Sequence, residues 1–396
     1  MQDKHRILTT VSLYHGLNDG AISVIPLLFP ILKDLFSLSY TQVGIITGGG
    51  FLVTLIAQLF IGRASDRRNF SFLLSIGILL LSLGMLVLTQ SRDFITLLLF
   101  MFLLRFAAAF FHPIGIGWIS RTFKHDRLDW AMGMQSGFGD LGAFIAVFTT
   151  LYIADITEWS VPLYLWAIVG IAGMLFGMFL TSNLSDKYTN SVKSLASSFS
   201  LKESISDAFV VFGRIKRFIL AFITSGASWG VTITFLPLLL AEKTTLPLAT
   251  IGIIVAMWIG FGTIVSFCYG KIKVLIGRMW VLIIAYLLLG VCSFLLVFFT
   301  STVIIIIAVA LLGFGIFLTF PALASFISEI THETVEGKTF AYTFTLQLAG
   351  GTVMLFLCGK LADTWGITMP FVAMGILGLC VLVILSMNFS HSLIQH

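Results

Sequence analysis

Long apolar stretches, each about as long as a bilayer is thick, run through this chain from end to end. A helix needs about 20 apolar residues to cross the hydrocarbon core of a membrane, and twelve stretches reach that length. Apolar residues make up 58% of the 396 residues and charged residues only 10%, with a mean hydropathy of +1.05. A water-facing fold could not bury this much apolar surface, so we predict an all-α integral membrane protein.

The predicted spans fall into two groups of six. Their limits are 7–33, 42–62, 70–90, 94–121, 130–153, 161–182, 215–241, 248–270, 279–299, 302–328, 338–360 and 367–389. The first span lacks a small-residue cleavage site and is expected to be a permanent span. We therefore predict an N-terminal bundle over 1–182, a cytoplasmic linker over 183–214 and a C-terminal bundle over 215–396. Within the linker, Ser200 and Glu203 have the spacing of a capping box, which predicts a short amphipathic helix on the membrane surface.

A charged turn that begins with glycine occurs once in each half of the chain. Gly62-Arg63-Ala64-Ser65-Asp66-Arg67-Arg68 follows span 2, and Gly270-Lys271-Ile272-Lys273-Val274 follows span 8, 208 residues later. At the same offset Pro113 matches Pro321, and spans 1 and 7 align at an offset of 211 through Pro26 and Pro237. Membrane proteins built from parallel repeats of this kind usually carry a solute between the two halves.

Positive charges are distributed unequally between the two sets of connections. One set, which includes both termini and the linker, holds eighteen Lys and Arg residues, and the other holds only Lys33, Arg92, Lys243 and Lys360. Cytoplasmic loops carry the excess of positive charge. We therefore expect a multi-pass protein of the inner membrane with both termini in the cytoplasm.

Several motifs resemble those of one transporter superfamily. The turn Gly62-xxx-Asp66-Arg67-Arg68, the segment Gly359-Lys360-Leu361-Ala362-Asp363-xx-Gly366 and the six-plus-six layout resemble the major facilitator superfamily. His15-Gly16-Leu17-Asn18-Asp19-Gly20 in span 1 and Phe111-His112-Pro113 in span 4 look like its fosmidomycin-resistance branch, although Ile114 stands where that branch tends to have an acidic residue. The resemblance implies drug efflux by antiport, and it implies an inner gate at Gly62, Asp66, Arg67 and Arg121.

Five ionisable residues lie deep within predicted spans, away from their ends, and each charge at mid-bilayer costs about 2.5–3.5 kcal/mol. They are His15, Asp19, Arg105, His112 and Asp140. At 1.5 Å per residue, Asp19, Arg105 and Asp140 fall near the midplane, with His15 and His112 below them toward the cytoplasm. We predict Asp19, His15 and Asp140 as proton-coupling residues. We predict Arg105 as a ligand for an anionic group of the substrate, or for the carboxylate of Asp19 when no substrate is bound. A mutually neutralised structural cluster is the alternative, and for His112 a packed histidine without a function.

Polar or indole side chains of other inner spans are the further candidates for contact with the solute. With Arg105 we predict Asn18, His112, Trp229 and Gln347 as substrate-binding residues, because Trp229 aligns near Asn18 in the repeat. Ser228 is a weaker candidate. For all of these, ordinary packing is the alternative.

No enzyme motif, cofactor fingerprint or metal-ligand spacing is present in the sequence. We expect no enzyme activity, no cofactor, no metal and no nucleic-acid partner, and we expect a monomer in the bilayer. The predicted function is proton-coupled export of a small amphiphilic or anionic organic compound by alternating access. An organic-anion uptake symporter or uniporter is the first alternative. A lipid-flipping or receptor-like membrane protein is the second.

Overall fold

The computed structural model describes residues 3–64, 69–124, 126–184, 209–330 and 333–394. These residues form helices and no strand. The helices, in chain order, are α1 (Asp3–Leu35), α2 (Tyr40–Ala64), α3 (Phe70–Leu88), α4 (Phe94–Ala108), the π-helix η2 (His112–Ile116), α5 (Gly117–Thr122), α6 (Asp126–Ile156), α7 (Val161–Thr181), the 3-10 helix η3 (Lys216–Phe218), α10 (Ile219–Lys243), α11 (Leu248–Ile276), α12 (Arg278–Phe298), α13 (Thr302–Ile330), α14 (Glu333–Trp365) and α15 (Met369–Ile394).

Twelve membrane spans are present among the described residues, as the sequence predicts. Several helices extend beyond the predicted limits, and α14 already begins at Glu333. Hydropathy detects the part of a helix that contacts lipid, whereas the helix itself continues into polar surroundings. The predicted linker helix at Ser200 lies outside the described residues, although residues 209–214 are helical.

Span 4 is interrupted in the middle. It consists of α4, η2 and α5, and the interruption coincides with His112 and Pro113. Proline has no N–H and its ring clashes with the preceding turn, so an α-helix cannot continue unchanged through it. The π-helix that results is the type of local irregularity often found at functional sites of membrane helices.

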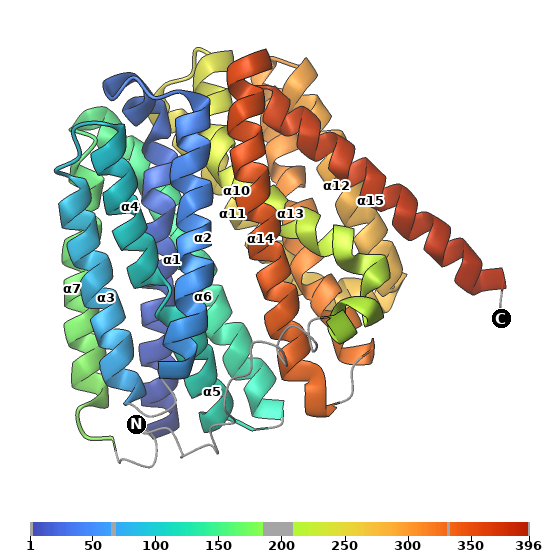
Figure 1. Cartoon of the computed structure of the whole chain (residues 1–396), viewed down its shortest axis with the longest axis horizontal. Helices are drawn as coiled ribbons and strands as arrows, with labels where there is room; N and C mark the ends of the chain where they lie inside the picture. The colour runs from blue at the N-terminus through green and yellow to red at the C-terminus, as the bar shows by residue number, and fades with distance from the viewer. Residues whose placement is uncertain (1–2, 65–68, 125, 185–208, 331–332, 395–396) are drawn as a thin grey trace. The chain divides into compact units, whose positions relative to one another are not determined.

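The chain forms two compact units. Unit 1 contains Met1–Leu38, Gly49–Ala196 and Pro247–Ala256, and unit 2 contains Ser39–Gly48, Ser197–Leu246 and Met257–His396. Helix α2 and helix α11 are thus each divided between the two units. In unit 1, α1 packs most extensively on α6, and α3 packs on α7 (Figure 1). In unit 2, α10 packs most extensively on α14, and α12 packs on α13 and α15.

Both of the main helix pairs cross where a glycine lets two backbones touch. A Cβ atom on Gly142 of α6 would lie 2.0 Å from the carbonyl oxygen of Gly16 in α1. A Cβ atom on Gly226 of α10 would lie 2.0 Å from the carbonyl oxygen of Gln347 in α14. Small residues at such crossings are typical of membrane helices, whose association depends on close packing. These two crossings place α1 and α10 at the centre of their units.

Candidate functional site in unit 1

His15 and Asp19 form a direct contact within α1. The imidazole Nε2 atom of His15 lies 3.2 Å from Oδ2 of Asp19, one helical turn further along. The other ring nitrogen, Nδ1, lies 2.8 Å from the main-chain oxygen of Gln135 in α6. A carbonyl oxygen can only accept a hydrogen bond, so Nδ1 carries a hydrogen. Without a further proton, Nε2 and Oδ2 would face each other with lone pairs, so the contact requires one proton between them.

Helix η2 and the residue before it close one side of this pair. The ring of Phe111 stacks on the imidazole of His15 with centroids 4.3 Å apart, and the ring of His112 meets it edge-on at 5.4 Å. The possible ligand atoms of His15, Asp19 and His112 all lie within 4.8 Å of one another. Two imidazoles and a carboxylate are also a set that could hold a transition metal ion. The interruption at Pro113 therefore brings two histidines from different helices together.

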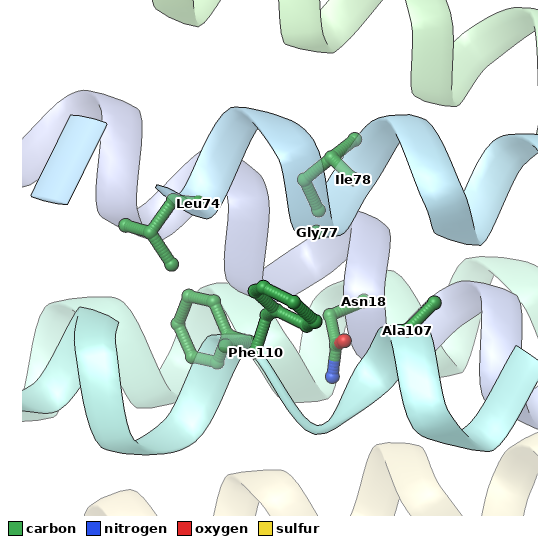
Figure 2. A pocket seen from close by; sticks show the side chains of 7 residues that line it. Asn18, Leu74, Gly77, Ile78, Ala107 and Phe110 are labelled. Carbon is green, nitrogen blue, oxygen red and sulfur yellow. The ribbon is translucent and has the colours of Figure 1, made fainter. Parts of the chain in front are cut away.

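Asn18 supports the second oxygen of the Asp19 carboxylate. Its amide nitrogen donates a hydrogen bond of 2.9 Å to Oδ1 of Asp19. Asn18 also lines a small pocket with residues of α3 and of the end of span 4, and this pocket leaves no room for a water molecule. In Figure 2, Leu74 and Ile78 of α3 lie on one side of the pocket, and Asn18 lies with Phe110 on the other. The pocket is a gap in the packing and is too small for a solute.

Arg105 is buried without a carboxylate partner. Its side chain is 4% exposed, and its guanidinium carbon lies 4.8 Å from the ring centroid of Phe51 in α2. Among the described residues no ion pair reaches it, and its Nε has no hydrogen-bond acceptor. The expected contact with the Asp19 carboxylate is not formed, because Asp19 pairs with His15 instead. A buried cation costs several kcal/mol unless it is compensated, which makes Arg105 a candidate site for an anion.

Asp140 lies near this cluster on α6 and is half-buried. Its charge interacts with those of Asp19 and His15. The midplane layer and the histidine layer of the depth estimate thus meet at the contact between Asp19 and His15. The carboxylate of Asp19 and the two histidines form one group, and Arg105 and Asp140 lie apart from the His15–Asp19 contact.

In unit 2, Trp229 lies among aromatic side chains, whereas Gln347 and Ser228 lie in helix packing. The ring of Trp229 in α10 lies 6.2 Å from that of Trp258 in α11, which in turn meets Phe317 of α13 at 5.8 Å. Gln347 is 9% exposed at the crossing of α10 and α14. Ser228 donates its hydroxyl hydrogen to the main-chain oxygen of Ser225, so its own helix satisfies it.

Sequence reasoning missed several residues next to the predicted ones, among them two aromatic residues. Phe51 covers Arg105, and Trp258 packs against Trp229. Phe51 directly follows Gly48-Gly49-Gly50, an unusual run inside a helix, and that run was an available signal. Nothing in the sequence distinguishes Trp258 from the other aromatic residues of the apolar spans.

The predicted inner gate is described only in part. Gly62 lies in the last turn of α2, whereas Asp66 and Arg67 lie outside the described residues. Arg121 lies near the end of α5, exposed, with its guanidinium carbon 4.9 Å from the ring centroid of Phe70. The inner gate at these four residues therefore stays a prediction.

Known proteins resemble this chain at two levels. By sequence, it is 38% identical over 109 residues to the uncharacterized MFS-type transporter YfnC of Bacillus subtilis (strain 168), covering 28% of this chain and 27% of that relative. It is 29% identical over 170 residues to the fosmidomycin resistance protein of Escherichia coli (strain K12), covering 42% of each. The matched regions thus span less than half the length of either relative.

By fold, the chain resembles solved transporters over nearly its whole length. The nucleoside transporter NupG superposes with a TM-score of 0.74 at 15% identity, covering 98% of this chain and 99% of that one. A bacterial homolog of the human lysosomal transporter Spinster superposes with a TM-score of 0.71 at 17% identity, covering 98% and 95%. At these identities the likeness shows the fold alone.

The family model reaches further along the sequence than either relative. Residues 11–354 match the model of the Major Facilitator Superfamily, and that range contains eleven of the twelve spans in whole or in part. The all-helical fold and the transporter relatives agree with the match. The chain therefore belongs to the Major Facilitator Superfamily and is a membrane transporter rather than an enzyme.

Proposed function

We propose that this chain is a proton-coupled exporter of small anionic or amphiphilic organic compounds, working by alternating access. The proposal includes an inner-membrane location, cytoplasmic termini and a monomeric state. It also assigns the alternating halves to residues 1–182 and 215–396, joined by the linker 183–214. The contact between His15 and Asp19 is the observation that carries it.

The proton that this contact requires provides a physical basis for coupling. With the proton in place, Nε2 of His15 and Oδ2 of Asp19 attract each other at 3.2 Å, and the pair is neutral overall. Without it, a buried negative charge is left facing a lone pair, which is unfavourable in a water-poor site. Loss of the proton therefore favours a conformation in which water reaches Asp19. A protonation step that stabilises one conformation over another is what drives alternating access.

The buried guanidinium of Arg105 supports the proposal that the transported compound carries an anionic group. Its guanidinium presents several N–H donors in a planar fork, which suits a carboxylate or phosphonate. The ring of Phe51 beside it offers an apolar surface for the rest of the compound. Trp229 and Gln347 of unit 2 are also proposed to contact the solute, since one lies beside a second indole ring and the other is a buried amide.

Export as the direction of transport rests on the relative named a fosmidomycin resistance protein. An organic-anion uptake symporter or uniporter remains the main alternative, because Arg105 serves either direction equally well. The lipid-flipping and receptor-like alternatives have no observation in their favour among the described residues.

A reconstitution experiment separates these functions by the sign of one signal. Liposomes containing the purified protein, radiolabelled fosmidomycin and the pH dye pyranine are diluted into buffer without fosmidomycin. An antiporter lets protons enter as the compound leaves, so the lumen should become more acidic while the label escapes. A symporter would make the lumen more alkaline.

Controls make the other outcomes decisive. Escape of the label without a pH change would overturn proton coupling. If the label escaped no faster than from liposomes without protein, fosmidomycin would not be a substrate. Arg92→Lys, which changes an exposed arginine of the same unit that has no assigned role, serves as the control that keeps full activity in this orientation-independent release. Scrambling of a fluorescent lipid at the same rate as label escape would favour the lipid-flipping alternative.

A further inference from the structure

We infer that Gly139 is a positioning residue that holds the His15 imidazole against Asp19, with Phe111 as the opposing wall. This inference deepens the proposed function, since it concerns how the proton-carrying contact is kept in place. The residues involved all belong to unit 1.

Gly139 leaves room for the imidazole on the α6 side. A Cβ atom at this position would have as its three nearest neighbours three ring atoms of His15, at 2.8 Å from Cδ2, 2.8 Å from Nε2 and 2.9 Å from Cε1. Contacts this short do not occur between real side chains, so any side chain at position 139 has to displace the ring. The crowding is specific, because the three nearest atoms all belong to the imidazole.

Phe111 prevents the ring from moving away from Gly139. Its side chain is 2% exposed and stacks nearly parallel to the imidazole, with 23° between the ring planes. The ring is thus enclosed between a glycine on one face and an aromatic ring on the other. Its edges are fixed by the carbonyl oxygen of Gln135 at Nδ1 and by the carboxylate of Asp19 at Nε2.

The charged and titratable groups around the ring come from several elements. Asp19 on α1 contacts it directly, while His112 on η2 and Asp140 on α6 interact with it electrostatically. Arg105 on α4 acts on Asp19 in turn. A displaced ring would therefore change its partner within a crowded polar cluster, and its hydrogen-bonding state should report the displacement.

The equivalent crossing in unit 2 shows that this packing is not a general requirement of the fold. With the offsets of the internal repeat, His15 corresponds to Gly226 and Gly139 corresponds to Gln347. In unit 2 the glycine is therefore on the central helix and the larger residue on its partner. At this pair of positions, unit 1 places the small residue on α6, which leaves room for a histidine on α1.

Nitrogen NMR of 15N-histidine-labelled protein tests the inference without any substrate. The chain has seven histidines, so the His15 signals are assigned by their loss in His15→Ala. In the wild-type protein we expect Nδ1 to be protonated throughout the accessible pH range, because the Gln135 carbonyl holds it. In Gly139→Ala we expect a mixture of the two tautomers. Gly133→Ala on the same helix, where a Cβ atom meets nothing within 4 Å, should leave the spectrum unchanged.

Thermal unfolding supplies a second, independent readout. Gly139→Ala should lower the Tm in the presence of His15, and this effect should shrink to about half or less in a His15→Ala background, because residues in contact act non-additively. A wild-type His15 spectrum in Gly139→Ala, or an equal fall in Tm in both backgrounds, would overturn the inference.

Failure of the proposed function looks different. Suppose that liposomes with the wild-type protein release label without a pH change, while Gly139→Ala shifts the His15 NMR signals. The positioning role of Gly139 is then supported, and the proposed proton coupling is contradicted. If coupling is observed and the His15 signals stay unchanged in Gly139→Ala, the positioning role falls alone.

Discussion

Helices α1 and α10 hold corresponding places in the two halves of the repeat, but they differ in chemistry. Both are largely buried, and both cross their main partner helix at a glycine contact. Helix α1 carries His15 and Asp19, whose contact needs a proton, whereas the buried hydroxyl of Ser228 in α10 is satisfied by its own helix. The same packing thus holds a titratable pair in unit 1 and a neutral surface in unit 2. A duplicated fold can therefore place ionic chemistry in one half only.

The largest expected effect comes from removing the proton site of unit 1. Asp19→Asn keeps the size of the side chain but cannot bind or release a proton, so proton-driven transport should fall by roughly two orders of magnitude, a typical scale for an essential proton-transfer group. Exchange of labelled solute down its gradient should persist. Proteoliposome flux with and without a pH gradient measures both.

Ser228→Ala changes a buried polar residue on the corresponding helix of unit 2 and should leave both fluxes within about two-fold, because an internal hydroxyl-to-carbonyl bond contributes only about 1 kcal/mol. If Asp19→Asn and Ser228→Ala reduced proton-driven flux equally, the proposed chemical difference between α1 and α10 would be wrong.

A second effect concerns the anion site. Arg105→Lys keeps the positive charge but loses the planar fork, so binding of carboxylates and phosphonates should weaken by about 10- to 100-fold, equivalent to about 1.5–3 kcal/mol for hydrogen bonds to a charged group. Thermal shift with a panel of small aromatic carboxylates and phosphonates gives the apparent affinity.

The comparison between units sharpens this test. Trp229→Phe in unit 2 should reduce the affinity for neutral and anionic members of the panel alike. If the Arg105→Lys variant still preferred anions to the same degree, Arg105 would not be the residue that recognises the anionic group.

The third effect tests whether the two glycine crossings are equally tight. Gly142→Ala in unit 1 and Gly226→Ala in unit 2 both place a Cβ atom where a carbonyl oxygen now lies 2.0 Å away. Each should destabilise the protein by about 1–3 kcal/mol, the usual cost of overpacking. Differential scanning calorimetry in detergent compares the two Tm values. A loss confined to one variant would show that the units differ in packing as well as in charge.

The smallest effect compares two carboxylates that cap helix starts. Asp363 of α14 accepts hydrogen bonds from the main-chain N–H groups of Tyr40 and Thr41, both at 2.8 Å, at the start of α2. Asp93 caps α4 locally through Thr96. Asp363→Asn should cost about 1 kcal/mol, as loss of a helix cap does, and should shift the Tm by a few degrees at most.

Asp93 adds a dependence on pH. The N–H and hydroxyl groups of Thr96 hold the pKa of its carboxyl below the ordinary value. Its contribution to stability is therefore complete above the ordinary pKa of aspartate and is lost as the pH falls through the lowered value. Asp93→Asn should remove that part of the acid dependence of the Tm. An unchanged acid limb would show that the cap contributes nothing.

The sequence by itself determined the membrane class, the spans and the repeat, because hydrophobic length and charge placement are properties of single segments. It also indicated the contact between His15 and Asp19, since residues four apart in a helix share a face. The glycine-led segment from Gly359 to Gly366 was recognisable as well, and Gly366 has the positive φ of 99° that ends α14.

Tertiary structure alone decided how those residues combine. Depth estimates placed Arg105 beside Asp19, but an estimate along one helix cannot say how that helix is rotated against its neighbours. The π-helix at His112 and the gap at Gly139 bring Phe111 and α6 against His15, and the carbonyl of Gln135 selects the tautomer. None of these contacts leaves a pattern in composition or periodicity, because each depends on the distance between two backbones that only packing sets.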